Sequence, residues 1–217
     1  MDCNENSPFN QYAKKYDSWY DTKGKLIFKI ELLAIKSILK GLPTPWVEIG
    51  VGSGRFAQAL GIPEGLDPSI ELLKIAKSRG ITVHLGKGEN LNFPDFSYGT
   101  VFLIVTLCFL PFPEIVFREI YRILKSEGKL LIAVVLSNSP WGIYYRKLKT
   151  QGHPFYKRAT FYTYNEIIEL SQKSGFSVEN TISTLFQEPN SVKNIEYHRT
   201  GYYPEAGFTI LILKKNS

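Results

Sequence analysis

Apolar residues follow two alternating patterns along the middle of this 217-residue chain. Short continuous apolar runs predict strands, and apolar residues three or four positions apart predict amphipathic helices. The expected strands cover residues 47–49, 65–67, 81–85, 100–106 and 129–136. Helices are expected at residues 56–60, 70–78 and 114–125, the last of them stopped by Gly128. This alternation predicts an α/β fold with a mostly parallel sheet and helices on both faces.

The N-terminal part of the chain carries helical patterns without a strand signal. Aromatic residues recur there at helical spacing, which places them on one face. They are Phe9, Tyr12, Tyr16, Trp19 and Tyr20. A second helix is expected over residues 26–39, ending near Gly41 and Pro43. We therefore expect a helical cover ahead of the sheet.

The C-terminal part predicts one more helix and two more strands. The helix covers residues 164–174 and is ended by Gly175, and the strands cover residues 177–186 and 208–214. About twenty irregular residues join these two strands, which leaves no room for a crossover helix. The last two strands should therefore pair in antiparallel fashion.

A glycine-rich loop follows the first expected strand. From Val47 to Arg55 the chain has the sequence Val-Glu-Ile-Gly-Val-Gly-Ser-Gly-Arg. A dinucleotide-binding loop has the spacing G-x-G-x-x-G and brings a pyrophosphate to a helix N-terminus. Here the third glycine comes one residue earlier, and the acidic Glu48 would not stabilise an anionic ligand. The loop suits a ligand with a positive charge and no phosphate. The alternative is a tight turn without a ligand.

A second acidic residue, Asp67, ends the next short apolar run. A carboxylate at the end of such a strand can accept hydrogen bonds from both hydroxyls of a ribose, as in nicotinamide-binding folds. The alternative role is an N-cap for the helix that begins at Ile70, because Asp favours that position. The two roles are compatible.

The pattern E-x-G-x-G-x-G, followed by Asp67, resembles the first motifs of the class I S-adenosylmethionine-dependent methyltransferases, in particular the small-molecule "type 11" family. The resemblance is good over residues 16–136 and looser elsewhere. It implies a Rossmann-like, seven-stranded, mostly parallel sheet in the order 3-2-1-4-5-7-6, with strand 7 antiparallel. It also implies the cofactor S-adenosylmethionine and its product S-adenosylhomocysteine.

The resemblance also implies which residues hold the cofactor. Glu48 would meet the methionyl ammonium, residues 88–90 would line the adenine, and Thr106 would lie beneath the sulfonium. The full set of expected cofactor-binding residues is Glu48, Ile49, Gly50, Val51, Gly52, Ser53, Gly54, Asp67, Pro68, Gly88, Glu89, Asn90 and Thr106.

We expect a single methyltransferase domain over residues 1–217. Its expected parts are a helical N-terminal cover (1–42), a cofactor-binding core (43–136), a lid or substrate segment (137–165), and a C-terminal helix with a strand pair (166–217).

The net charge of +6 is concentrated in one segment. Between Ser137 and Asn165 there is no Asp or Glu, and the five cations there are Arg146, Lys147, Lys149, Lys157 and Arg158. A basic segment with interleaved aromatic residues can bind an acidic small molecule or stack on nucleic-acid bases. The alternative is a solvated basic helix with aromatic residues packed on the core. The candidates for a substrate wall are Tyr16, Tyr20, Trp141, Tyr144 and Tyr145, for which a plain core role is the alternative.

Metal chemistry and a membrane location are not expected. The three histidines are scattered and only two cysteines are present, so no metal site is predicted. His153 and His198 are candidates for a base that deprotonates the acceptor. No apolar run approaches the roughly 20 residues that span a bilayer. A reduced cytoplasmic setting is the expectation.

These patterns predict methyl transfer from S-adenosylmethionine to a small-molecule acceptor, acidic or aromatic, by in-line displacement. One alternative is an RNA-modifying methyltransferase in which the basic segment grips phosphate. Another is a protein that binds the cofactor without transferring its methyl group. The acceptor atom and the oligomeric state stay open.

Overall fold

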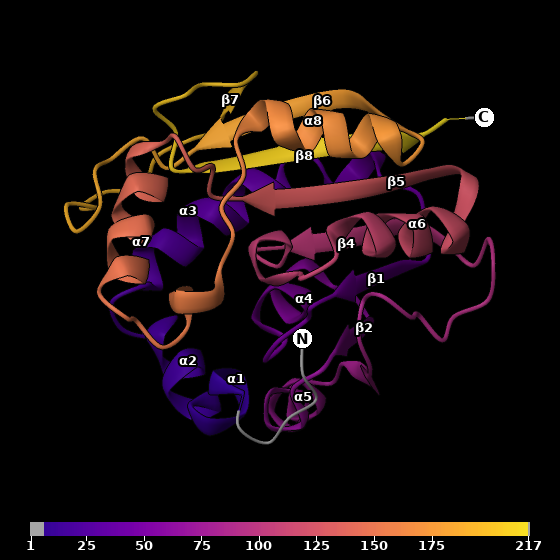
Figure 1. Cartoon of the computed structure of the whole chain (residues 1–217), viewed down its shortest axis with the longest axis horizontal. Helices are drawn as coiled ribbons and strands as arrows, with labels where there is room; N and C mark the ends of the chain where they lie inside the picture. Colours follow the sequence, from indigo (N-terminus) through magenta and orange to yellow (C-terminus); the bar gives the residue numbers. More distant parts are fainter. Residues whose placement is uncertain (1–6, 217) are drawn as a thin grey trace.

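The computed structural model describes residues 7–216 and centres on an eight-stranded sheet (Figure 1). The strands lie in the order β3-β2-β1-β4-β5-β8-β6-β7. They are β1 (Trp46–Ile49), β2 (Glu64–Asp67), β3 (Thr82–Leu85), β4 (Tyr98–Ile104), β5 (Leu124–Val134), β6 (Phe176–Thr184), β7 (Arg199–Thr200) and β8 (Phe208–Lys215). Each predicted strand is present, with its ends moved by a few residues.

The sheet has the predicted mixture of strand directions. Neighbouring strands from β3 to β5 pair in parallel, and β8 runs antiparallel to both β5 and β6. The difference from the predicted seven strands is β7, whose two residues pair with Ile182 and Ser183 at the edge of the sheet. Such a short pairing has no apolar pattern of its own. Without β7, the order is the predicted 3-2-1-4-5-7-6.

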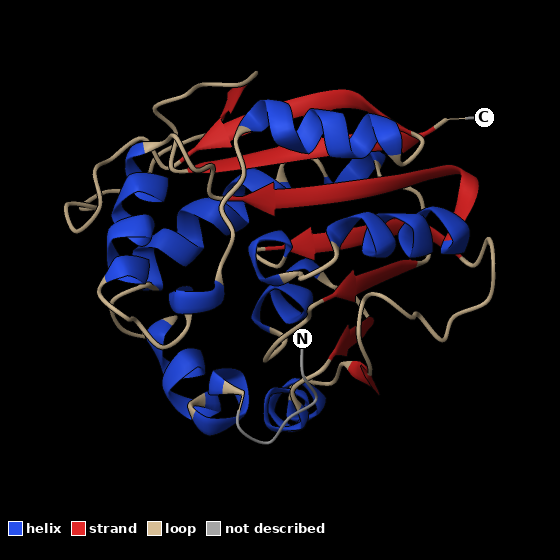
Figure 2. Cartoon of the chain, in the orientation of Figure 1, coloured by secondary structure: helices blue, strands red, loops and turns tan. Residues whose placement is uncertain are grey.

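Helices cover both faces of the sheet (Figure 2). The helices are α1 (Pro8–Gln11), α2 (Ala13–Trp19), α3 (Lys25–Lys36), α4 (Arg55–Leu60), α5 (Ile70–Ser78), α6 (Pro113–Ile123), α7 (Pro140–Thr150) and α8 (Tyr164–Lys173). Side chains of α3, α4 and α5 form one hydrophobic core, and side chains of α6 and α8 form the other. Alternate residues of β4 enter the two cores, so its sequence is apolar without a break from Val101 to Ile104.

Three predicted boundaries are wrong in detail. The aromatic segment 8–20 is two short helices that meet at Tyr12, and α3 ends at Lys36 before a 3₁₀ turn, η1 (Leu39–Gly41). Gly128 does not stop α6. That helix ends at Ile123, because Leu124 is already extended (φ −75°, ψ 135°) and pairs with Tyr98 as the first residue of β5.

The cover of the sheet gathers at one end. In Figure 1 the parallel strands point toward α7, α2 and α1. The segment after β5 forms α7, a 3₁₀ turn η3 (Tyr156–Arg158) and then α8. Local sequence fixes these helices, since Ser139 caps α7 and Thr163 with Glu166 forms a capping box for α8. Among residues 7–216, no helix combines the length and apolar character needed to span a bilayer.

Candidate functional site

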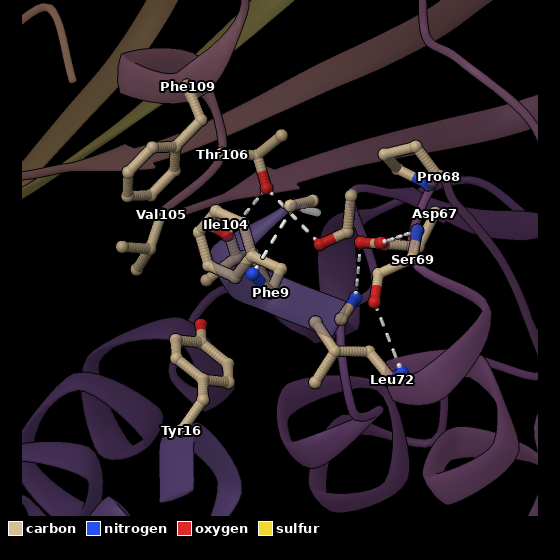
Figure 3. A pocket seen from close by; sticks show the side chains of 13 residues that line it. Phe9, Tyr16, Asp67, Pro68, Ser69, Leu72, Ile104, Val105, Thr106 and Phe109 are labelled. Carbon is tan, nitrogen blue, oxygen red and sulfur yellow. Dashed lines mark hydrogen bonds between the residues drawn. The ribbon is translucent and has the colours of Figure 1, made fainter. Parts of the chain in front are cut away.

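A cavity of about 480 Å³ lies where β1, β2 and β4 end (Figure 3). Gly50, Gly52 and Asp67 line it from the sheet side, together with Thr106, while Tyr16 closes it from α2. A second hollow of about 280 Å³ shares Tyr16, Gly50 and Gly52 with the first and is also lined by Glu48 and Tyr20. Carboxyl ends of parallel strands meet here, as expected for ligand binding in open α/β sheets.

Glu48 presents an unpartnered carboxylate oxygen to this site. The residue is 2% exposed, and its Oε2 atom has no hydrogen-bond partner in the described structure. Burial, with Asp67 nearby, raises the pKa of the Glu48 carboxyl well above its usual range. A buried acceptor without a donor is costly unless a ligand supplies one. Glu48 is therefore suited to an N–H group, above all a cationic one.

Asp67 holds two loops together at the end of β2. Its Oδ2 accepts a hydrogen bond from the Gly52 N–H at 2.9 Å, and its Oδ1 accepts one from the Ser69 N–H at 2.8 Å. Burial nevertheless raises the pKa of this carboxyl to about 6. The side chain that caps α5 is that of Ser69, whose Oγ accepts from the Leu72 N–H at 3.3 Å. A carboxylate has about four acceptor positions, so two remain for a ligand.

Gly50 and Gly52 both line the cavity, but of the three loop glycines only Gly52 has space for a side chain. Its φ is +53°, and an added Cβ would contact only the Tyr16 and Leu72 side chains, at 3.9 and 4.0 Å. Both of these side chains line the cavity, so a larger residue at position 52 would fill it. A Cβ at Gly54 would instead press on Ala76 of α5 at 3.1 Å. The expectation that all three glycines open the backbone to a ligand therefore fits Gly52 best.

Aromatic rings from three separate segments close the cavity. Phe9 of α1 packs against Tyr16 at a centroid distance of 5.6 Å, against Phe109 at 5.1 Å and against Phe155 at 5.3 Å. Phe109 belongs to the 3₁₀ turn η2 (Leu107–Phe109) that follows β4. The Tyr16 and Tyr20 hydroxyls lie 3.2 Å apart. The cover is thus built from the N-terminal helices, the β4 turn and the segment after α7.

An ion-pair network fixes α2 to the glycine loop. Asp17 accepts hydrogen bonds from Arg55 and from Arg79, with shortest distances of 2.8 Å to each. Arg55 is the residue directly after the glycine motif, and Arg79 follows α5. Burial opposes ionisation of Asp17, but these two guanidinium groups outweigh it and hold the pKa of the carboxyl well below its usual range. The aromatic cover is therefore positioned by charge as well as by packing.

Several residues predicted for the site do not line the cavity. Trp141 is buried and donates from its Nε1 to the Gln187 carbonyl at 2.8 Å, and Tyr144 bonds to Asn190 at 3.3 Å. His153 stacks on Tyr156 at 4.8 Å, and burial lowers its pKa. The predicted residues that line neither hollow are Ile49, Gly54, Gly88, Glu89, Asn90, Trp141, Tyr144, Tyr145, His153 and His198.

The cavity also uses residues that the sequence did not single out. They include Phe9, Ser69, Leu72, Ile104, Val105 and Phe109. Val105 follows the central strand and has a φ of +53°, which is unusual for a β-branched residue. Its N–H donates to the Ala133 carbonyl at 2.8 Å. Backbone strain of this kind concentrates at functional sites. In the sequence, Val105 is marked only by its position directly after an apolar strand.

The basic side chains of the segment after β5 lie away from the cavity. Arg146, Lys147, Lys157 and Arg158 are exposed. Lys149 donates to the Ala159 carbonyl at 2.6 Å and so ties α7 to η3. In residues 7–216, no group of three or more His, Cys, Asp or Glu side chains could hold a metal ion.

Comparisons with known proteins agree with this geometry. The model of the methyltransferase-domain family matches residues 47–132, which include the glycine loop and Asp67. A solved structure from Thermotoga maritima, described as an S-adenosylmethionine-dependent methyltransferase and possible histamine N-methyltransferase, is 36% identical. It superposes with a TM-score of 0.90 and covers 96% of this chain and 99% of its own. The chain belongs to the class I S-adenosylmethionine-dependent methyltransferases.

Other relatives of this methyltransferase span most of its length. An uncharacterised protein of Methanocaldococcus jannaschii is 37% identical over 95% of this chain and 98% of its own. One of Mycobacterium tuberculosis is 38% identical over 92% of this chain and 70% of its own. The cofactor of this methyltransferase is S-adenosylmethionine, as its motif predicted.

Proposed function

We propose that the methyltransferase binds S-adenosylmethionine in the cavity at the ends of β1, β2 and β4. Glu48 takes the methionyl ammonium, and Asp67 accepts hydrogen bonds from the ribose hydroxyls. The observation that carries this proposal is the pair of buried carboxyls on either side of Gly52, each with acceptor positions that no protein donor fills. The open space at the Gly52 Cβ position gives the ligand room to approach the backbone.

In this proposal the loop after β3 binds the adenine. The Glu89 Oε1 atom is buried and has no partner in the described structure, so it can accept from an exocyclic amine. Gly88 is packed against Val116 and Ile49, which fixes the loop backbone. The remaining proposed cofactor residues shape the cleft around these contacts: Ile49, Gly50, Val51, Ser53, Gly54, Pro68, Asn90 and Thr106.

The chain's own residues act mainly by positioning and by excluding water. When bound, S-adenosylmethionine supplies a methyl group on a sulfonium, which an acceptor lone pair takes by in-line displacement as the C–S electron pair leaves on a neutral thioether. Phe9, Tyr16 and Phe109 close the cleft over that group. Orientation of this kind reaches effective molarities of about 10⁵ M or more. Burial raises the pKa of Tyr16 to about 12, so its hydroxyl stays neutral beside the ligand.

We propose a small-molecule acceptor rather than RNA. Tyr16, Tyr20 and Phe56 line the hollow beside Glu48, and the exposed cations of α7 and η3 are not among its lining residues. In this proposal residues 1–42 and 137–165 form the cover, 43–136 the cofactor-binding core, and 166–217 the C-terminal helix and strand pair; residues 1–6 and 217 lie outside the described structure. The Thermotoga relative's description names histamine, which is a small aromatic molecule.

A labelling experiment tests the proposal. The protein is incubated with methyl-labelled S-adenosylmethionine and either the small-molecule or the RNA fraction of a cell extract, and the labelled product is identified. We expect label in the small-molecule fraction, and loss of that label in Gly52→Val. Label in RNA alone would replace the proposed acceptor class. Absence of cofactor binding by calorimetry would overturn the site.

A further inference from the structure

The two carboxyls proposed to hold the cofactor lie beneath the N-terminal helices. Glu48 is 2% exposed and Asp67 is 6% exposed. Tyr16 of α2 lines both hollows, and Phe9 of α1 lines the larger one (Figure 3). A ligand of the size of S-adenosylmethionine cannot reach carboxyls buried to this degree unless part of the cover moves. Entry of the cofactor therefore requires a movable segment.

Helices α1 and α2 are the covering elements with few buried residues. Within these described helices, α1 buries none of its residues and α2 buries Ala13, whereas α3 buries five. Tyr16 and Trp19 are only partly buried, and Tyr20, directly after α2, belongs to the hydrophobic core. Segments with few buried apolar contacts open at a low free-energy cost. The part of the cover ahead of Tyr20 is thus suited to move while α3 stays in place.

Polar side chains fasten these two helices to the rest of the molecule. The Asn10 Oδ1 atom of α1 accepts a hydrogen bond from the Ser69 Oγ at 2.6 Å and one from the Glu71 N–H at 3.3 Å. Both donors lie at the N-terminal end of α5. Asp17 fastens α2 through the two arginines described above. The position of the cover therefore depends on a small number of directional contacts.

The Asn10 contact is joined to the carboxyl that is proposed to bind the ribose. Ser69 donates its Oγ–H to Asn10, and its N–H donates to the Asp67 Oδ1 at 2.8 Å. The Asp67 Oδ2 in turn accepts from the glycine loop. Phe9 is the residue before Asn10, and its ring packs on Phe109 at 5.1 Å across the cavity. One chain of hydrogen bonds thus connects the cofactor loop with the helix that carries Phe9.

We propose that Asn10 is a positioning residue for methyl transfer: it fastens α1 and α2 over the cleft, and cofactor and product exchange when its contact opens. This deepens the proposed function and rests on it. Asn10 lines neither hollow, so it acts through Ser69 and through the placement of Phe9. Each turnover consumes one S-adenosylmethionine and leaves one S-adenosylhomocysteine under the cover. The Asn10 contact therefore opens once for each methyl group transferred.

This role has a kinetic signature that loss of a direct ligand contact does not have. If the ligand enters and leaves only the open form, its association and dissociation rate constants both scale with the fraction of open protein. A weaker Asn10 contact raises that fraction in the free and in the bound protein, so both rate constants rise while Kd changes little. Loss of a direct contact would raise the dissociation rate constant and Kd together.

The test measures both rate constants for S-adenosylhomocysteine by surface plasmon resonance on the full chain. The variants are Asn10→Leu, which is similar in size but accepts no hydrogen bond, and Asn10→Asp, which keeps the acceptor oxygen. The control is Asn165→Leu, because Asn165 is an exposed residue of α8, which packs in the other core. Asn10→Leu should raise both rate constants at least about fivefold, the lower limit for two net hydrogen bonds, and change Kd less than about threefold. Asn10→Asp and the control should keep the parent values.

Proteolysis gives a second readout of the same movement. Lys14 and Lys15 are exposed on α2, and trypsin cleaves there when the helix leaves its place. In the parent, saturating S-adenosylhomocysteine should slow this cleavage, and Asn10→Leu should speed it in the ligand-free protein. Mass spectrometry identifies the cut, and thermal melts separate opening of the cover from global unfolding.

The outcomes separate this inference from the proposed function. Absence of S-adenosylhomocysteine binding by the parent would defeat the cofactor site itself. If the ligand binds, but Asn10→Leu leaves both rate constants unchanged or raises only the dissociation rate constant, Asn10 does not fasten a movable cover. Asn10→Asp behaving like Asn10→Leu would refute the role of the acceptor oxygen. The parent needs no variant: equal cleavage after Lys14 and Lys15 with and without ligand would overturn the movement of the cover.

Discussion

Asp67→Asn tests the proposed role of the Asp67 carboxyl, which accepts hydrogen bonds from the loops after β1 and β2 and also faces the ligand. The substitution keeps the size of the side chain and one carbonyl oxygen, but it replaces the other acceptor oxygen with an NH₂ group. That group must face the N–H of either Gly52 or Ser69, both of which now donate to Asp67 at 2.9 and 2.8 Å. The N–H of Gly52 or Ser69, and at least one ribose hydroxyl of the ligand, then lose an ionised acceptor.

The expected loss follows from these bonds. A hydrogen bond to a charged group contributes about 1.5–3 kcal/mol. We take a loss of about 2 kcal/mol in binding, which corresponds to a roughly 30-fold higher Kd for S-adenosylhomocysteine. The weakened hydrogen bond from Gly52 or Ser69 destabilises the free protein as well as the complex. That part cancels in the binding free energy, which keeps the estimate at the lower end of the range.

The pH dependence gives the sharper readout. Burial places the pKa of Asp67 at about 6, so the carboxyl is ionised above that pH and protonated below it. Ligand hydroxyls need the ionised acceptor, so parent affinity should be constant above pH 7. It should fall about tenfold per pH unit below pH 6. Asp67→Asn cannot titrate and should show a low, flat profile.

The assay is calorimetric titration with S-adenosylhomocysteine between pH 5 and pH 8. Asp95→Asn is the matched control, because Asp95 is an exposed acid that pairs with Arg122 outside the cleft. Equal affinities for parent and Asp67→Asn at pH 8 would refute the ribose role. A parent profile that is flat down to pH 5 would refute the assigned ionisation.

Three further predictions concern the loop, the cover and the basic segment. Gly52→Val should abolish the rise in melting temperature caused by S-adenosylhomocysteine, whereas Gly61→Ala, also at positive φ but facing open space, should keep it; equal responses would contradict the role of Gly52. Asp17→Asn should lower the free energy of unfolding in urea by about 2 kcal/mol, because it leaves Arg55 and Arg79 poorly paired. The pKa of Asp17 is depressed in the fold, so this difference should be full above about pH 4 and shrink as the pH falls further; a difference undiminished at pH 2 would argue against the ion pairs. Changing Arg146, Lys147, Lys157 and Arg158 to Gln should leave the rate of methyl transfer to a small molecule unchanged. If the parent protein binds RNA tightly and the four substitutions flatten the salt dependence of that binding, the small-molecule assignment is overturned.

The sequence by itself determined the order of the elements and the centre of the cofactor site. Residues 101–104 are apolar without a break because β4 is buried on both faces, and that signal is local. Glu48, Gly52 and Asp67 could be placed together from the sequence because parallel strands bring their carboxyl ends to one edge. The same local logic failed at Gly128, because pairing of Leu124 with Tyr98 ends the helix at Ile123, two residues before its predicted end.

Only the tertiary structure decided what covers that site. Glu31 follows a helical apolar pattern in which it is an ordinary polar position, and nothing local marks it as buried. Phe9, Phe109 and Phe155 likewise belong to segments far apart in the chain, and the Phe109 and Phe155 rings meet the Phe9 ring only because these segments fold over the same end of the sheet. Local periodicity encodes which face of a helix is apolar, but burial and ionisation depend on what the other elements place against that face.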